Sequence, residues 1–151
     1  RKPLTTSFTP LLMAFAFAMA DLWRTGLDDP LRAVDAYGTL QESSPGDPRV
    51  LDALMSMVGE GSEASSAADV LLSHYRSERQ WADVTAVLER LAPHVVASDD
   101  QVALQRELAE LRCEHLDDLP GAFDALQVAL RKLLSHQAML QACTALQAVF
   151  V

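Results

Sequence analysis

The amino-acid sequence predicts an all-α protein of about eight helices packed as antiparallel neighbours. Half of its 151 residues are apolar but only 6% are aromatic, and Ala and Leu, which supply most of the apolar content, favour helices over sheets. Apolar residues recur with helical spacing between capped boundaries, and no stretch alternates with period two for long enough to form a strand. Parts of the sequence also repeat at a constant offset of 89 residues, which is typical of repeat proteins.

The repeat is clearest between residues 22–37 and residues 111–126. Its internal identities are Leu27, Asp28, Asp29, Ala33, Asp35 and Ala36, which match Leu116, Asp117, Asp118, Ala122, Asp124 and Ala125. We expect a single domain over residues 1–151 with two copies, at about residues 9–58 and 98–147. The offset contains five expected helices, which breaks a strict alternation of two layers. The short third helix is the candidate for the irregular one.

The first two expected helices begin at prolines that follow capping residues. The first has Thr9 as its cap and Pro10 at its first position, and it ends near Thr25 before a glycine. The second is capped by Asp28 or Asp29, opens at Pro30, and ends at the Ser-Ser-Pro-Gly run of residues 43–46. Its inward stripe is predicted to be Leu31, Val34, Tyr37 and Leu40.

The third and fourth expected helices are separated by the glycines of residues 59–61. The third follows Asp47 and spans Pro48 to Val58, and the fourth is capped by Ser62 and stops at the tight connection of residues 77–80. The third helix carries Val50, Leu51, Leu54 and Val58 on one face. The buried face of the fourth is predicted to include Ala68, Leu71, Leu72 and Tyr75.

The fifth and sixth expected helices meet at Pro93, which ends or kinks the fifth. Ser98 caps the sixth, and Gln101 completes a capping box. The stripe of the fifth helix comprises Trp81, Val84, Leu88 and Leu91. The stripe of the sixth comprises Leu104, Leu108 and Leu111 and extends to His115.

The seventh helix is expected to be capped by Asp117 or Asp118, and the eighth by Ser135. The residues predicted to point inward from the seventh are Leu119, Phe123, Leu126, Leu130 and Leu133. The eighth carries Met139, Leu140, Cys143, Leu146 and Phe150. Residues 138–151 contain no charge, whereas terminal repeats usually present a polar outer face. We therefore expect another element to cover this end, either further chain or a second copy in a self-association; burial inside this fold is the alternative.

The helix pairs resemble tetratricopeptide repeats, most strongly over residues 68–91. Leu71-Leu72 occupies the leucine–glycine position of that family, Tyr75 its tyrosine, Trp81 its turn and Leu88 its later aromatic. Leu72 and Arg79 stand where the family has glycine, Arg112 stands about where it has tyrosine, and Leu119-Pro120 reverses the usual placing of the proline. The resemblance implies hairpins stacked as a right-handed superhelix, or solenoid, and a HEAT-like stack is the structural alternative. It also implies a non-catalytic protein–protein interaction scaffold that binds a peptide or a partner helix in a groove.

No motif for catalysis, cofactor binding or metal binding is present. The histidines, His74, His94, His115 and His136, lack the spacing of paired ligands on one helix face, and the acidic pairs at 28–29, 99–100 and 117–118 lie at helix starts, where they act as caps. The aromatic residues Trp23, Tyr37, Trp81 and Phe123 are expected in the core. We therefore predict no enzyme activity; the alternatives are a helical enzyme or ligand-binding domain with an unrecognised site, and a structural spacer in a longer array.

Composition sets further expectations about partners and location. The net charge of −9 predicts basic or neutral partners and no nucleic acid, with Arg76, Arg79 and Arg90 as the strongest local exception. The resemblance to tetratricopeptide repeats implies that the partner is a protein or peptide. Cys113 and Cys143 are too few for a disulfide framework. Residues 1–20 resemble a signal peptide, but the repeat runs through them, so a folded helix, no membrane span and a cytoplasmic protein are expected. The first residue is not Met, and a piece of a longer protein is expected.

Overall fold

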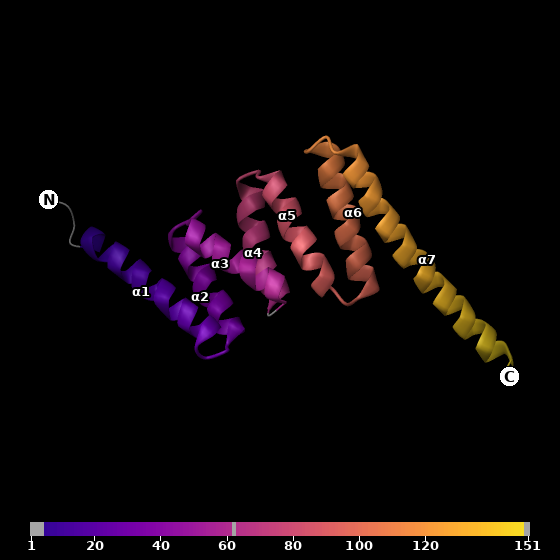
Figure 1. The fold of residues 1–151 in the computed structure, drawn as a ribbon, viewed down its shortest axis with the longest axis horizontal. Helices are drawn as coiled ribbons and strands as arrows, with labels where there is room; N and C mark the ends of the chain where they lie inside the picture. The colour runs from indigo at the N-terminus through magenta and orange to yellow at the C-terminus, as the bar shows by residue number, and fades with distance from the viewer. Residues whose placement is uncertain (1–4, 62, 150–151) are drawn as a thin grey trace. The chain divides into compact units, whose positions relative to one another are not determined.

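The chain folds into seven α-helices and one 3-10 turn over the residues that the structure, a computed structural model, describes: 5–61 and 63–149, with no side-chain description for 5–9, 139, 142, 143, 146, 148 and 149. No strand occurs in these ranges, which confirms the all-α class. The helices are α1 (Thr5–Thr25), α2 (Pro30–Ser43), α3 (Pro48–Glu60), α4 (Ala64–Ser77), α5 (Trp81–Leu91), α6 (Ser98–Glu114) and α7 (Leu119–Val149), with the 3-10 turn at Ala92–His94 (Figure 1). The chain divides into two compact units, residues 1–80 and residues 81–151.

The first unit has its core where α2 meets its neighbours. Helix α1 packs on α2, α3 packs on α4, and α2 contacts both α3 and α4. The predicted stripes are largely confirmed, because the largest fully buried side chains of this unit include Tyr37, Leu54 and Leu71. Leu31 is an exception. It was expected to point inward, but it is 53% exposed, because it lies outside the face of α2 that carries the buried residues.

The beginnings of α2 and α3 follow local capping chemistry. The Asp29 carboxylate accepts a hydrogen bond from the Arg32 amide at 3.2 Å, and Asp47 accepts one from the Arg49 amide at 3.0 Å. The guanidinium of Arg49 also pairs with Asp47 at 3.1 Å, and this hydrogen bond lowers the pKa of the Asp47 carboxyl. Proline follows each capping aspartate, where its fixed φ suits the first helical position.

The connection between α1 and α2 has the same backbone as the connection between α6 and α7. Asp28 and Asp117 have φ values of 49° and 50°, a left-handed conformation that aspartate tolerates better than most residues. The Asp29 amide donates to the Trp23 carbonyl at 2.9 Å, and the Asp118 amide donates to the Arg112 carbonyl at 2.8 Å. The Asp-Asp pairs therefore have two roles, since the first residue turns the chain and the second caps the next helix.

Three predicted helix starts need correction or lie outside the description. Helix α1 begins at Thr5, so Thr9 is no cap and Pro10 lies inside the helix. Ser62, the expected cap of the fourth helix, lies outside the described residues. Gln101 forms no capping box, because its side-chain amide donates to the Val95 carbonyl at 2.6 Å, and the cap position before Ser98 is Ala97, which has no side-chain cap.

Helix α7 is one continuous helix and replaces the seventh and eighth expected helices. Ser135 was predicted to start a new helix, but its hydroxyl donates to the Lys132 carbonyl at 2.9 Å within α7. Residues 122–149 contain neither Pro nor Gly, so nothing in them stops a helix. Leu140 is exposed. The side chains of Met139, Cys143 and Leu146, and all of Phe150, lie outside the described residues.

Candidate functional site

The buried face of α7 carries alanines rather than leucines. Ala122, Ala125 and Ala129 are buried, and α7 packs along α6. On α6, Leu104, Leu108 and Leu111 of the predicted stripe are buried, but His115, to which the stripe was expected to extend, is exposed. Small side chains let two helices approach closely, because interaxial distance depends on the side chains at the contact. Ala122, which matches Ala33 in the 89-residue repeat, is buried like Ala33.

This packing overturns the prediction that the large side chains of α7 point inward. Phe123 is 63% exposed and Leu126 is 50% exposed. The same holds for the other members of that predicted stripe, Leu119, Leu130 and Leu133. The helix has two apolar faces, one of alanines and one of leucines with Phe123, and within this unit the alanine face meets α6. A row of large apolar side chains therefore faces outward along α7.

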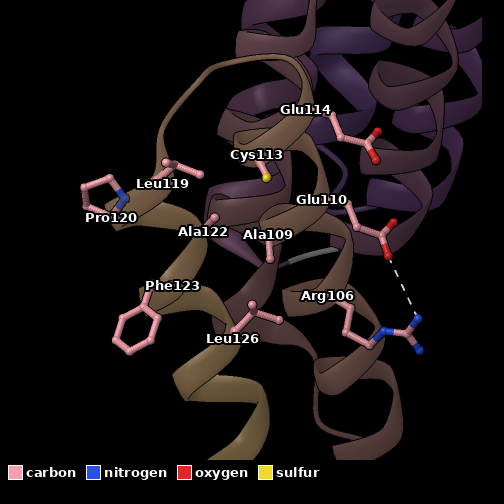
Figure 2. A pocket seen from close by; sticks show the side chains of 10 residues that line it. All are labelled: Arg106, Ala109, Glu110, Cys113, Glu114, Leu119, Pro120, Ala122, Phe123 and Leu126. Atoms are coloured by element: carbon pink, nitrogen blue, oxygen red, sulfur yellow. Dashed lines mark ion pairs between the residues drawn. The ribbon is translucent and has the colours of Figure 1, made fainter.

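A groove of about 710 Å³ lies beside this row, between α6 and α7. We call it the α6–α7 groove. It is lined by Arg106, Ala109, Glu110, Cys113, Glu114, Leu119, Pro120, Ala122, Phe123 and Leu126. Figure 2 shows Leu119, Pro120 and Phe123 on the α7 side and Arg106, Glu110 and Glu114 along α6, with Ala109, Ala122 and Cys113 between them. The floor is thus apolar and one rim is charged.

The charged rim has an acidic balance. Arg106 pairs with Glu110 at 3.9 Å with both side chains exposed, so the pair contributes little to stability. Glu114 adds a second carboxylate, and the Cys113 thiol is free and exposed. Electrostatic complementarity therefore favours an uncharged or basic occupant over an acidic one.

The end of the groove is held in place by Arg112. Its guanidinium donates to the Gly121 carbonyl at 2.9 Å and forms an ion pair with Glu89 of α5. The Asp118 carboxylate accepts from the Gly121 amide at 3.0 Å and so caps α7, as predicted for Asp117 or Asp118. These bonds tie the end of α6 to the first turn of α7. This end of the groove is therefore fixed by contacts within the unit.

The candidate chemical groups of the sequence do not converge. Among the described residues, no group of three or more His, Cys, Asp or Glu side chains is placed to hold a metal ion. His115 stacks on Trp81 with ring centroids 4.3 Å apart, while His94 is exposed on the 3-10 turn. Of the four aromatic residues expected in the core, Tyr37 is buried and Trp23 and Trp81 are half-buried, but Phe123 is exposed. The expectation for Phe123 is wrong, because the alanines of α7 take the core position.

A second hollow of about 510 Å³ lies between α2 and α4 and has a more polar lining. It is lined by Gly38, Gln41, Glu42, Pro45, Asp69, Val70, Ser73, His74 and Ser77. The side-chain amide of Gln41 is buried there, and none of the described residues forms a hydrogen bond with it. Burying an amide group without a hydrogen-bond partner costs free energy. The row of exposed apolar side chains makes the α6–α7 groove the stronger site.

Sequence reasoning did not find the α6–α7 groove, although one signal for it was present. The alanines at 122, 125 and 129 have helical spacing of their own, which defines a second possible contact face.

Comparison with protein-family models, with curated proteins and with solved structures finds no match to this chain. Among the described residues, no helix is both long and apolar enough to cross a membrane.

Proposed function

We propose that this chain is a non-catalytic protein-interaction scaffold of the tetratricopeptide type, which binds a partner helix in the α6–α7 groove. The observation that carries the proposal is the exposed row of Leu119, Phe123, Leu126 and Leu130 beside that groove. Exposed apolar side chains gathered on one face mark interaction sites. The same proposal includes the right-handed superhelical stacking of such proteins. It also includes a protein or peptide partner, in place of nucleic acid or membrane, and a cytoplasmic location.

The geometry of the row favours a helical partner. Its members recur at intervals of four and three residues, so they lie along one side of α7. An amphipathic helix that enters such a groove presents its own apolar residues at the same spacing. The carboxylates of Glu110 and Glu114 on the rim then favour basic side chains at the edge of the partner.

A labelled amphipathic peptide of leucine and lysine tests the proposal. Leucines at helical spacing form its apolar face, and a peptide of the same composition in scrambled order is the control. Binding is measured by fluorescence anisotropy against the full chain. We expect the ordered peptide to bind, and Phe123→Glu or Leu126→Glu to weaken binding at least about tenfold, because a charge would then be buried in an apolar contact.

Leu31→Glu is the matched control variant, since Leu31 is also an exposed leucine on a helix but lies outside the groove. It should leave the affinity unchanged. Equal affinity for the ordered and scrambled peptides, or full affinity in Phe123→Glu, would contradict the proposal.

A further inference from the structure

The open α6–α7 groove corresponds to a covered surface in the first unit. At the offset of 89 residues, Cys113, Phe123 and Leu126 match Arg24, Val34 and Tyr37. The connecting turns of the two hairpins share their φ values and hydrogen bonds. Yet Val34 and Tyr37 are 4% and 0% exposed, whereas Phe123 and Leu126 face outward. Both α3 and α4 contact α2 in the first unit, and one of these two helices also contacts α1 through its side chains.

That helix is α3. Near its beginning, the Arg49 guanidinium lies over the Phe17 ring of α1, 5.3 Å from the ring centroid. At its end, Glu60 binds Arg24 of α1 at 2.7 Å. Between these two contacts α3 buries Val50, Leu54, Met57 and Val58, and it packs on both α2 and α4. Helix α3 therefore lies along the hairpin on the face that is open in the second copy.

The same offset places residues 137–149 at the positions of α3. Met139, Leu140, Cys143 and Leu146 match Val50, Leu51, Leu54 and Met57, so the apolar spacing of α3 recurs. The charges change together on both sides: Arg24 and Glu60, which form an ion pair, become Cys113 and Val149. Residues 137–149 could therefore fill the groove without leaving a charged side chain whose ion-pair partner is missing. Residues 138–149 carry no charge, so they bring no acidic side chain against the acidic rim.

The connection before residues 137–149 prevents them from folding back as α3 does. In the first copy, α2 ends at Ser44-Pro45-Gly46-Asp47, and Gly46 has φ of 82°. The matching residues 133–136, Leu-Leu-Ser-His, continue α7 as a helix. Helix α7 extends beyond the N-terminal end of α6 (Figure 1). Residue 137 lies about 16 Å beyond Leu126 along a straight helix. Residues 137–149 of one chain thus point away from its own groove.

We infer that the α6–α7 groove is filled by residues 137–149 of a second copy of this chain, and that two copies exchange these segments reciprocally. This inference rests on the proposed function and names the helix that the groove binds. The segment has the length of α3, 13 residues, so it spans the same hairpin. Exchange of an identical element is a known route to a dimer when the connection favours the extended form.

Cross-linking between two single-cysteine chains tests the exchange. One chain is Cys143→Ser, which keeps Cys113; the other combines Cys113→Ser, Cys143→Ser and Val149→Cys. Positions 113 and 149 match the paired residues Arg24 and Glu60. A short bismaleimide should therefore join the two chains into a heterodimer when they are mixed. Phe123→Glu in the first chain should abolish the product, and Leu31→Glu should not.

Three other outcomes separate this inference from the proposed function. A chain with Cys113, Val149→Cys and Cys143→Ser that cross-links only within itself would overturn the exchange, as would a wild-type chain that sediments as a monomer at all concentrations. In either case binding of the leucine–lysine peptide would leave the proposed function standing. If exchange occurs, Leu146→Glu should weaken dimerisation and should increase peptide binding, because it empties the groove.

Discussion

Gly38 lies in the interior of α2, where a methyl group would have room. A Cβ atom built at this position would meet only the Val70 side chain, at 3.9 Å, an ordinary van der Waals distance. Close packing therefore does not require glycine here, contrary to what its place inside a helix suggests. Gly38→Ala should stabilise the fold by about 1 kcal/mol through helix propensity. The midpoint of urea denaturation measures this, and a fall in the midpoint would show that α2 and α4 approach more closely.

Arg79 occupies a left-handed backbone position, with φ of 56°. The tetratricopeptide pattern has glycine at this turn, and glycine alone adopts this conformation without steric penalty. Arg79→Gly should therefore stabilise the fold, by about 1 kcal/mol. Ser73→Gly is the control, since Ser73 lies exposed inside α4 and glycine there should destabilise by a similar amount. Equal effects of the two substitutions on the thermal midpoint would contradict the argument.

The beginning of α3 should make stability depend on pH. The pKa of the Asp47 carboxyl is lowered by its hydrogen bond with Arg49, so its stabilising contribution is complete above the ordinary value of 3.8 and is lost as the pH falls below it toward the lowered value. Asp47→Ala should lower the free energy of unfolding by about 1 kcal/mol at neutral pH, through loss of the cap. Denaturation at neutral pH and at about pH 3 measures both effects.

Asp47→Asn is the matched control for this cap. Asparagine caps a helix about as well as aspartate but does not titrate. The variant should keep most of the stability at neutral pH and lose less of it in acid than the wild type. The same acid sensitivity in Asp47→Asn and in the wild type would assign it to other carboxylates.

Each hairpin depends on a small residue at its helix contact. Ala33 of α2 is fully buried and Ala122 of α7 is nearly so. Leucine at either position would overpack the contact, so Ala33→Leu and Ala122→Leu should each destabilise the fold by about 1–3 kcal/mol. Ala103→Leu, at an exposed position of α6, should change the denaturation midpoint little. An unchanged midpoint in both buried variants would place the helix contacts elsewhere.

The charge of the whole molecule predicts its behaviour toward nucleic acid. A net charge of −9 repels the phosphate backbone, which basic side chains must neutralise for binding. We expect no affinity for random-sequence duplex DNA at physiological salt in a mobility-shift assay. Arg76, Arg79 and Arg90 are the residues to substitute first if a salt-sensitive complex forms.

Helix identity and most helix boundaries follow from the sequence by itself. Proline after aspartate begins α2 and α3, and Gly61, with φ of 82°, ends α3. Capping and turn formation involve residues a few positions apart. The repeat of 89 residues likewise located two hairpin turns of equal geometry. Local chemistry is therefore enough to predict these features.

Tertiary packing decided which face of α7 is buried. Periodicity marks an apolar face, but α7 has two, and only contact with α6 selects the alanines over the row that contains Phe123 and Leu126. The serine at 135 is compatible with a cap or with a helix interior, where its hydroxyl donates to a preceding carbonyl. A break there would require a covering contact for the segment that follows. The groove is open because that contact is absent within the described part of this unit. Whether a helix face is buried depends on residues that are close in space but far apart in the chain, so the local sequence does not decide it.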